Sequence, residues 1–368
     1  MAKSRLHELT ERGQSVWFDT LSRDLVHSGG LKRMMEEDAV TGVTSNPTIF
    51  QKALSEGDAY DDQLKELLAV EDDPTKIFFA LALDDIRDAC DVLRPAYDAS
   101  GGGDGYVSME VEPGIAYDTR KSFQQARWIA TEVDRPNLYV KIPATAPGLP
   151  AIEDCIAHGT SINITLIFSL QRYEAVVEAY LRGIERLVAG GGDPSSVVSV
   201  ASFFVSRVDT ETDKRLDALG RQELQGKLAI ANAKLAYQHY LKAFAGPRWD
   251  FLAGKGARPQ RCLWASTSTK NPEYRDVMYV EELIGPDTVN TMPLETIEAF
   301  QDHGEVRGNT VLEGIEDAER LLVELRDVGV DYDDVVETLE EEGVQKFADS
   351  FAELLDGVRS KRGELAAA

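Results

Sequence analysis

Eight short apolar runs limit this chain to a small number of folds. They lie near residues 15–19, 40–45, 106–112, 138–144, 161–167, 197–205, 261–267 and 288–293. Helix-like segments separate most of these runs, and repeated strand–helix units indicate a parallel sheet. Eight such units predict a (β/α)8 barrel of the TIM type, in the α/β class. The alternative is an open doubly wound sheet, which would lack a ring of inward-facing side chains.

Helices are expected where apolar residues recur three and four positions apart. The clearest examples are 74–93, 119–133, 169–188, 222–244 and 272–284. Two glycine clusters, at 101–105 and 190–192, shortly precede strand-like runs, so we interpret them as helix-to-strand turns.

The 368 residues contain no evident linker, and we expect one domain over 1–368. The barrel would take about 15–300. The tail, from about 306 to 368, is acidic and helical in pattern, and we expect a C-terminal helical extension. We expect this extension to pack on the exterior or bottom of the barrel, with its charges on a solvated face.

Lys141 is the residue that most strongly suggests chemistry, because it lies inside the apolar run 138–143. Burying an unpaired ammonium is costly, and full burial lowers the pKa of a lysine by up to about 3 to 5 units. A neutral buried amine is a nucleophile. The alternative is a lysine near a strand end whose amine reaches water.

Polar side chains also interrupt the other apolar runs, and within a strand they fall on one face. They are Asp19, Glu110, Asn163, Thr165, Ser202 and Ser266. In an antiparallel sheet such alternation would mark a solvated face. In a (β/α)8 barrel, polar residues near the carboxyl ends of different strands converge on one mouth. We therefore expect these residues and Lys141 to line a single site.

The formal net charge of −25 argues against nucleic acid as a partner, because duplex binding requires a basic surface. An anionic substrate would have to meet a local basic patch. Residues 1–14 are polar, and no uninterrupted apolar stretch is long enough to span a bilayer. We therefore expect no membrane association and a cytoplasmic location.

The cysteines and histidines show no arrangement typical of a metal site. Cys90, Cys155 and Cys262 are scattered, with no spacing for zinc or for a disulfide framework, and the five histidines form no ligand pair. We expect reduced packing cysteines, no metal and no cofactor.

Two sequence motifs resemble those of a known family. Residues 42–50, GVTSNPTIF, are similar to the first transaldolase signature, and residues 138–145, LYVKIPAT, are similar to the second, which carries the Schiff-base lysine. The resemblance continues through 108–111, 163–169, 202–207 and 265–271. It covers about residues 15–300 and implies a class I aldolase with an eight-stranded barrel.

The resemblance implies covalent catalysis by Lys141. Its amine would attack C2 of a ketose phosphate and form an imine, which serves as an electron sink. Asp19 would remove the proton of the C4 hydroxyl, so that the C3–C4 bond breaks and an aldose phosphate leaves. The dihydroxyacetone unit would stay on the lysine until an acceptor aldehyde phosphate takes it, with Asp19 returning the proton.

Further roles follow from the same resemblance. Glu110 and Thr165 would hold a water that shuttles protons, and Asn46 and Asn163 would hydrogen-bond the donor's hydroxyls. For Glu110 the alternative is a direct salt bridge with Lys141, which would favour the protonated lysine. The water-holding role and the salt bridge are compatible only if water intervenes.

The phosphate end of the substrate would rest on Arg207, with hydroxyls from Ser202 and Ser266. Arginine suits this task because its planar fork grips two phosphate oxygens. Many transaldolases have Ser-Phe-Arg-Asn after the seventh strand, whereas this chain has Ser-Thr-Ser-Thr-Lys-Asn at 266–271. Lys270 would supply the second cation there, and the alternative is a lysine exposed on a surface loop.

The function implied is transaldolase, in the non-oxidative pentose phosphate pathway. The donor would be sedoheptulose 7-phosphate or fructose 6-phosphate, and the acceptor glyceraldehyde 3-phosphate or erythrose 4-phosphate. One alternative is a fructose 6-phosphate aldolase that releases free dihydroxyacetone. Glu110 and Phe204 argue against it, because those aldolases carry glutamine and tyrosine there. Another alternative is a non-catalytic sugar-phosphate-binding barrel. The sequence leaves open whether the protein forms a homodimer.

Overall fold

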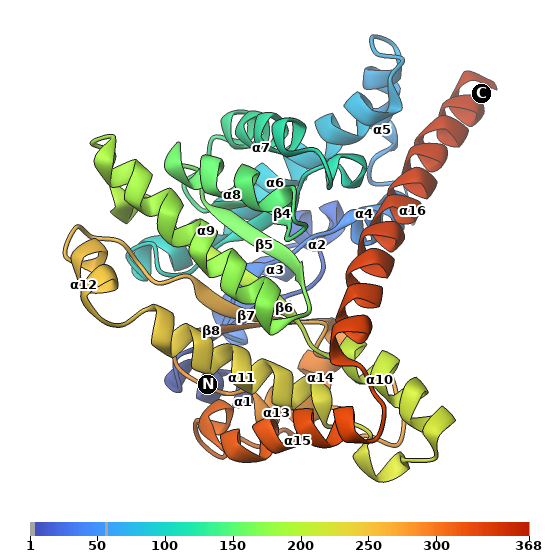
Figure 1. Ribbon diagram of the computed structural model, residues 1–368. Coiled ribbons are helices and arrows are strands. Elements are labelled where there is room, and N and C mark those ends of the chain that lie inside the picture. The colour runs from blue at the N-terminus through green and yellow to red at the C-terminus, as the bar shows by residue number, and fades with distance from the viewer. Residues whose placement is uncertain (1–3, 56–57, 368) are drawn as a thin grey trace.

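Eight parallel strands close into a barrel in the order of the chain (Figure 1). The structure is a computed structural model that describes residues 4–55 and 58–367. The strands are β1 (Gln14–Phe18), β2 (Val40–Val43), β3 (Val107–Glu110), β4 (Leu138–Pro143), β5 (Ile162–Ile167), β6 (Ser199–Phe204), β7 (Arg261–Ala265) and β8 (Thr288–Met292). Pairing of β1 with β8 closes the ring. The predicted (β/α)8 barrel is confirmed, and the open sheet is wrong.

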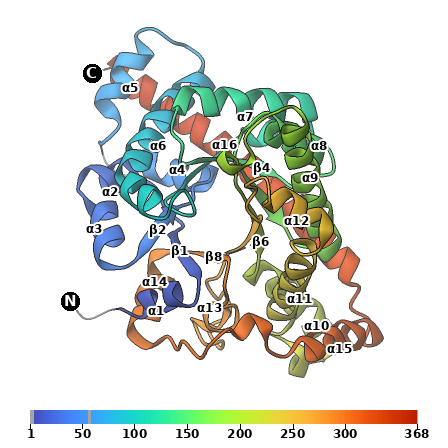
Figure 2. The same cartoon turned by 90° about the vertical axis from the view of Figure 1, so that its left-hand side faces the viewer.

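Helices cover the outer face of the barrel on all sides (Figure 1, Figure 2). Those up to β6 are α1 (Arg5–Glu11), α2 (Arg23–His27), α3 (Gly30–Glu37), α4 (Pro47–Ser55), α5 (Asp61–Leu68), α6 (Pro74–Ala99), α7 (Thr119–Val133), α8 (Gly148–Ala157) and α9 (Leu170–Ala189), with the 3₁₀ turns η1 (Pro113–Ile115) and η2 (Pro194–Ser196). Strands covered in this way are buried on both faces, which explains their near-continuous apolar sequence.

The second half of the chain is less regular. Its elements are α10 (Ser206–Leu219), η3 (Gln222–Leu224), α11 (Leu228–Ala243), α12 (Pro247–Ala253), α13 (Met278–Glu282), α14 (Leu294–His303), η4 (Thr310–Leu312), α15 (Ile315–Asp327) and α16 (Tyr332–Ala367). No helix among the described residues is long and apolar enough to cross a membrane.

Capping residues explain why three predicted helices begin where they do. Asp73, Asp118 and Ser169 each accept a hydrogen bond from a backbone N–H in the first turn of α6, α7 and α9. The predictions 119–133 and 169–188 are accurate to within one residue. The prediction 74–93 is also confirmed, although α6 continues to Ala99.

Two helix predictions need correction. The segment 222–244 is not continuous, because Gly226 has a φ of +68° and divides η3 from α11. The segment 272–284 is mostly irregular and contains only α13. There the Asn271 side chain accepts from the N–H of Glu273, and the Tyr274 hydroxyl donates to Asp213 on α10. These bonds favour turns over the helix that the apolar spacing predicts.

Aromatic rings close the barrel interior below Lys141. Trp17, Tyr139 and Tyr106 occupy inward positions. The centroid of the Tyr139 ring lies 6.0 Å from that of Trp17 and 4.3 Å from that of Tyr106. The Trp17 indole N–H donates to Asp104 at 2.8 Å. The closed floor keeps water from reaching Lys141 from the amino-terminal side of the barrel.

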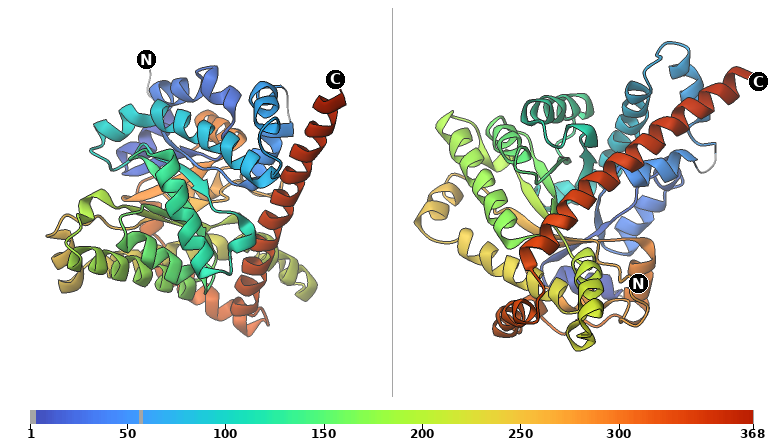
Figure 3. Two further views of the ribbon diagram at one scale, coloured as in Figure 1. Left: turned by 90° about the horizontal axis from the view of Figure 1, so that it is seen from above. Right: turned by 45° about the vertical axis from the view of Figure 1, so that its right-hand side comes forward.

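The C-terminal extension differs from the prediction in its second half. As expected, α15 packs outside the barrel against α11. In contrast, α16 does not lie on the bottom. It crosses the mouth of the barrel, where it packs against α4, α10, η1 and the end of β5 (Figure 3). Gly343 lies at this close crossing, where a Cβ would lie 3.0 Å from the end of the Leu166 side chain.

Gly42 on β2 is the position where the barrel floor tolerates no side chain. A Cβ there would lie 2.5 Å from the Trp17 ring. We predict that Gly42→Ala lowers the stability by roughly 1–3 kcal/mol or more, because neither the indole nor the strand has room to move. Gly357→Ala is the matched control, since nothing lies within 4 Å of a Cβ there and alanine favours a helix. Thermal unfolding measures both, and equal midpoints for Gly42→Ala and the parent protein would contradict this account.

Candidate active site

Lys141 and Glu110 form a buried ion pair in the centre of the barrel. The two residues are register partners on β4 and β3. The Lys141 Nζ lies 3.2 Å from the Glu110 Oε2, and the two side chains are only 6% and 3% exposed. Nζ also donates to the Ser45 carbonyl at 3.0 Å. The alternative of an amine that reaches water is therefore wrong, and the Glu110 contact is direct.

Burial raises the pKa of Glu110, and the charge of Lys141 opposes that shift. A carboxyl group with a raised pKa more readily accepts a proton from its ammonium neighbour. The Thr165 hydroxyl is buried and has no hydrogen-bond partner among the described residues. Its strand is next to that of Lys141, with Thr165 paired in register with Pro143. Glu110 is therefore placed to exchange a proton with the lysine, and Thr165 borders the same cavity as Lys141.

Asp19 lies just beyond β1, where its backbone N–H donates to the Met292 carbonyl at 2.9 Å. The Thr44 hydroxyl donates to its carboxylate at 2.6 Å and also lies 2.6 Å from the Thr291 hydroxyl. Burial raises the pKa of Asp19, while the Thr44 bond and the charge of Lys141 lower it. A carboxyl group with a raised pKa is better suited to taking up and returning a proton.

The two asparagines expected to bind donor hydroxyls occupy different places. Asn46 borders the cavity beside Lys141 at the start of α4, where its side-chain oxygen accepts from the N–H of Ile49. Asn163 is fully buried and lies outside the cavity wall. It accepts from the Ser202 hydroxyl at 2.6 Å and donates to the Ser108 hydroxyl at 3.0 Å. In this arrangement Asn163 positions Ser202, which does reach the cavity.

Arg207 and Lys270 mark the end of the cavity suited to an anion. The Arg207 guanidinium lies 5.0 Å from the centroid of the Phe204 ring and has no ion pair or hydrogen bond with any described residue. Burial lowers the pKa of Arg207. The Lys270 amine donates to the Ser268 hydroxyl at 2.6 Å. Both cations therefore retain donors for a phosphate. Lys270 borders the cavity but is exposed, so its role in phosphate binding stays a prediction.

Ser266 borders the same end in an unusual backbone conformation. Its φ is +56°, which is rare for a residue with a side chain and typical of functional sites. Its hydroxyl lies 2.8 Å from that of Ser206 at the start of α10. The pair ties the segment after β7 to the helix that carries Arg207.

The predicted residues converge on one cavity of about 300 Å³ at the carboxyl ends of the strands. Nine of the eleven line it, namely Asp19, Asn46, Lys141, Thr165, Ser202, Phe204, Arg207, Ser266 and Lys270. Glu110 lies behind Lys141, and Asn163 lies behind Ser202. The wall also contains residues that the sequence analysis missed, namely Thr44, Thr48, Lys52, Ser268, Thr291, Glu295 and Phe347. Thr44 and Thr48 belong to the motif at 42–50, whereas Phe347 had no signal beyond helical spacing.

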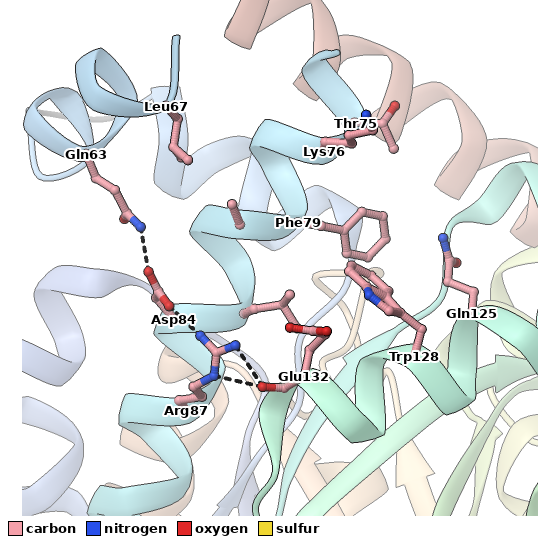
Figure 4. A pocket seen from close by; sticks show the side chains of 12 residues that line it. Gln63, Leu67, Thr75, Lys76, Phe79, Asp84, Arg87, Gln125, Trp128 and Glu132 are labelled. Atoms are coloured by element: carbon pink, nitrogen blue, oxygen red, sulfur yellow. Dashed lines mark hydrogen bonds and ion pairs between the residues drawn. The ribbon is translucent and has the colours of Figure 1, made fainter. Parts of the chain in front are cut away.

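A larger cavity, of about 580 Å³, lies outside the barrel between α5, α6 and α7 (Figure 4). Three of its charged side chains, Lys76, Asp84 and Arg87, are already in ion pairs. Arg87 donates to the Asp84 carboxylate and to the Glu132 carbonyl, and Gln63 donates to Asp84. Its apolar wall is formed by Phe79 against Trp128, with ring centroids 5.3 Å apart. The cavity contains no nucleophile beside a base, so size alone does not identify the active site.

The described residues offer no evident set of metal ligands. Within residues 4–55 and 58–367, no group of three or more His, Cys, Asp or Glu side chains is arranged to hold a metal ion. The three cysteines are buried thiols without disulfide partners.

Comparisons with known proteins agree with this geometry. The family model described as transaldolase/fructose-6-phosphate aldolase matches residues 16–358. A transaldolase of Parafrankia sp. (strain EAN1pec) is 53% identical over 98% of this chain and 99% of its own length. Transaldolases of Acidothermus cellulolyticus and Mycolicibacterium paratuberculosis are each 51% identical over 97% of this chain, covering 99% and 97% of their lengths.

The fold and these relatives define an aldolase-type enzyme built on a closed parallel barrel. The chain belongs to the transaldolase/fructose-6-phosphate aldolase family. These comparisons confirm the predicted family. They also confirm that the protein is an enzyme and that its function is that of a transaldolase. The non-catalytic sugar-phosphate-binding barrel is therefore excluded.

The hydrogen bond from Thr44 to Asp19 provides a test of the acid–base role. Because this bond favours the charged carboxylate, Thr44→Val should raise the pKa of Asp19 further. If Asp19 must be deprotonated to start cleavage, the acid limb of kcat/KM should move to higher pH, by about one unit for a bond to a charged group. Thr48→Val is the control, since Thr48 borders the same cavity but donates to Ser350. If the acid limb of the pH profile of kcat/KM does not move in Thr44→Val, Asp19 does not have this role.

Proposed function

We propose that the cavity catalyses dihydroxyacetone transfer through an imine on Lys141. The observation that carries this proposal is the Lys141–Glu110 pair, buried at the wall of a cavity that also contains Asp19. A lysine held there has a proton acceptor at contact distance and little access to water. An adjacent carboxylate that can take the ammonium proton is the usual means by which a lysine is activated as a nucleophile.

The first half of the reaction builds the imine. Glu110 takes the ammonium proton, and the Lys141 amine attacks C2 of the ketose phosphate. The carbonyl oxygen is protonated and leaves as water, with Glu110 and Thr165 relaying protons. Asp19 then removes the proton of the C4 hydroxyl, and the C3–C4 bond breaks. Its electrons move into the imine, which becomes an enamine, and the aldose phosphate leaves.

The second half runs in reverse with a different aldehyde. The enamine carbon attacks the carbonyl of the acceptor, and Asp19 returns its proton to the new hydroxyl. Water then hydrolyses the imine and frees Lys141. The donors we propose are sedoheptulose 7-phosphate and fructose 6-phosphate, with glyceraldehyde 3-phosphate and erythrose 4-phosphate as acceptors.

The unpaired cations support phosphorylated substrates. Arg207 is partly enclosed without a counter-ion from the described residues, and Lys270 contacts only a hydroxyl. A phosphate would supply the missing negative charge and accept bidentate hydrogen bonds from the guanidinium. With a net charge of −25, the protein needs such a local site to attract an anion.

Two residues favour transfer over release of free dihydroxyacetone. Glu110 is a carboxylate that pairs with Lys141. The Phe204 ring carries no hydroxyl, and its centroid lies 5.2 Å from the centroid of the Phe168 ring. The resemblance places glutamine and tyrosine at these positions in the aldolases. The three free buried thiols support a cytoplasmic location, which stays a prediction. The homodimer also stays a prediction.

Borohydride trapping with fructose 6-phosphate tests the mechanism. In the parent protein we expect the three-carbon unit on the Lys141 peptide after reduction, because cleavage precedes trapping. In Asp19→Ala the imine should still form but cleave slowly, so the six-carbon ketose should be trapped instead. Mass spectrometry of the digested protein distinguishes the two adducts.

Lys141→Ala is the control for the trapping experiment and should gain no adduct. An adduct on another lysine, or a three-carbon adduct formed at the normal rate in Asp19→Ala, would contradict the assigned roles. Circular dichroism of both variants shows whether the fold is retained.

A further inference from the structure

The long helix α16 is attached on both sides of the barrel mouth that it crosses. On one side, Arg172 at the start of α9 pairs with Glu340 at 3.1 Å. On the other side, the Thr48 hydroxyl on α4 donates to that of Ser350 at 2.8 Å. The stretch of helix between these two attachments, residues 341–349, therefore has a defined position at the mouth.

One buried ring on this stretch reaches the cavity. Gly343 lies against the end of β5, where a Cβ would be 3.0 Å from the Leu166 side chain and 3.5 Å from the Phe168 ring. Phe347 follows four residues later, so it lies on the same face of the helix. Of the described residues of α16, Phe347 alone lines the cavity, and its side chain is buried. The close approach of the helix therefore brings this ring into the cavity wall.

The Arg207 guanidinium lies near two aromatic rings that come from different elements. Its central carbon is 5.0 Å from the centroid of the Phe204 ring, at the end of β6, and 6.0 Å from the centroid of the Phe347 ring. Arg207 has no ion pair or hydrogen bond with any residue that the structure describes. In place of a carboxylate partner, the rings of Phe204 and Phe347 therefore flank this guanidinium.

Aromatic neighbours suit an arginine that has to bind an anion. A carboxylate would neutralise the guanidinium and occupy its donors, whereas the face of a ring attracts the cation and leaves the N–H groups available. A long arginine side chain also loses rotamer freedom when it grips a phosphate, and holding it in place beforehand reduces that cost. Removal of one flanking ring should therefore weaken the binding of a phosphate even though the arginine remains.

We propose that Phe347 is a positioning residue of the active site, whose ring holds the Arg207 guanidinium ready for the phosphate of the substrate. The inference rests on the proposed sugar-phosphate function and extends it to a helix that the sequence motifs do not include. It also gives α16 a reason to cross the mouth, because the helix supplies the ring that β6 cannot provide on the second side of Arg207.

Acceptor kinetics test the proposal with Phe347→Leu, which keeps an apolar side chain and removes the ring. With fructose 6-phosphate saturating, the KM for glyceraldehyde 3-phosphate should rise by about three- to tenfold, as expected for loss of one aromatic contact to a desolvated cation. The kcat and the KM for unphosphorylated glyceraldehyde should change little. Phe351→Leu is the matched control, because Phe351 is buried on the same helix against Phe78 and does not line the cavity. It should leave the ratio of the two KM values unchanged.

A double-mutant cycle shows whether Phe347 acts through Arg207. In an Arg207→Met background, which already lacks the guanidinium, adding Phe347→Leu should not raise the KM for glyceraldehyde 3-phosphate further. A further rise of the same size as in the parent protein would overturn the proposal. An equal rise in KM for both acceptors in Phe347→Leu alone would also overturn it, because that result would indicate a displaced helix.

Calorimetric titration with inorganic phosphate gives a readout that does not depend on turnover. Phe347→Leu should weaken phosphate binding by a factor similar to its effect on KM, and Phe351→Leu should leave the affinity unchanged. Equal phosphate affinity in Phe347→Leu and the parent protein would contradict the proposal. If the parent protein transferred nothing, the proposed function would fail, while the titration would still decide the role of Phe347.

Discussion

The buried ion pair of Lys141 and Glu110 is the interaction on which the site depends. Two charges removed from water are costly, and each is stable only while the other remains beside it. Their contact follows from the register of β3 and β4, which places the residues side by side inside the ring. The aromatic floor around Tyr139 closes the cavity from below, and Gly42 leaves room for that floor. The fold therefore creates the isolation that the chemistry needs.

Other ionisable side chains surround this pair. Burial raises the pKa of Asp19 and of Glu110, so both can exchange protons with a substrate. Arg207 lies at the other end without a counter-ion among the described residues. One cavity wall thus contains Lys141, the acid–base group Asp19 and the cations Arg207 and Lys270, a combination that fits a phosphorylated sugar.

Much of the fold and most of the site were predictable from the sequence. Buried parallel strands need apolar runs, and barrel topology brings their carboxyl ends together, so Asp19, Lys141 and Ser202 converge as expected. Local patterns did not reveal long-range bonds: Tyr274 holds Asp213 and prevents a helix at 272–284. The crossing of α16 was missed for the same reason, because helical spacing does not say which surface a helix will cover.

The most direct test of the central claim is the rate of imine formation in a single turnover with fructose 6-phosphate. If Glu110 accepts the lysine proton, Glu110→Gln should form the imine at least tenfold more slowly, in line with the contribution of a positioned base. Circular dichroism should show that the variant remains folded. Imine formation at the parent rate in Glu110→Gln would contradict the account.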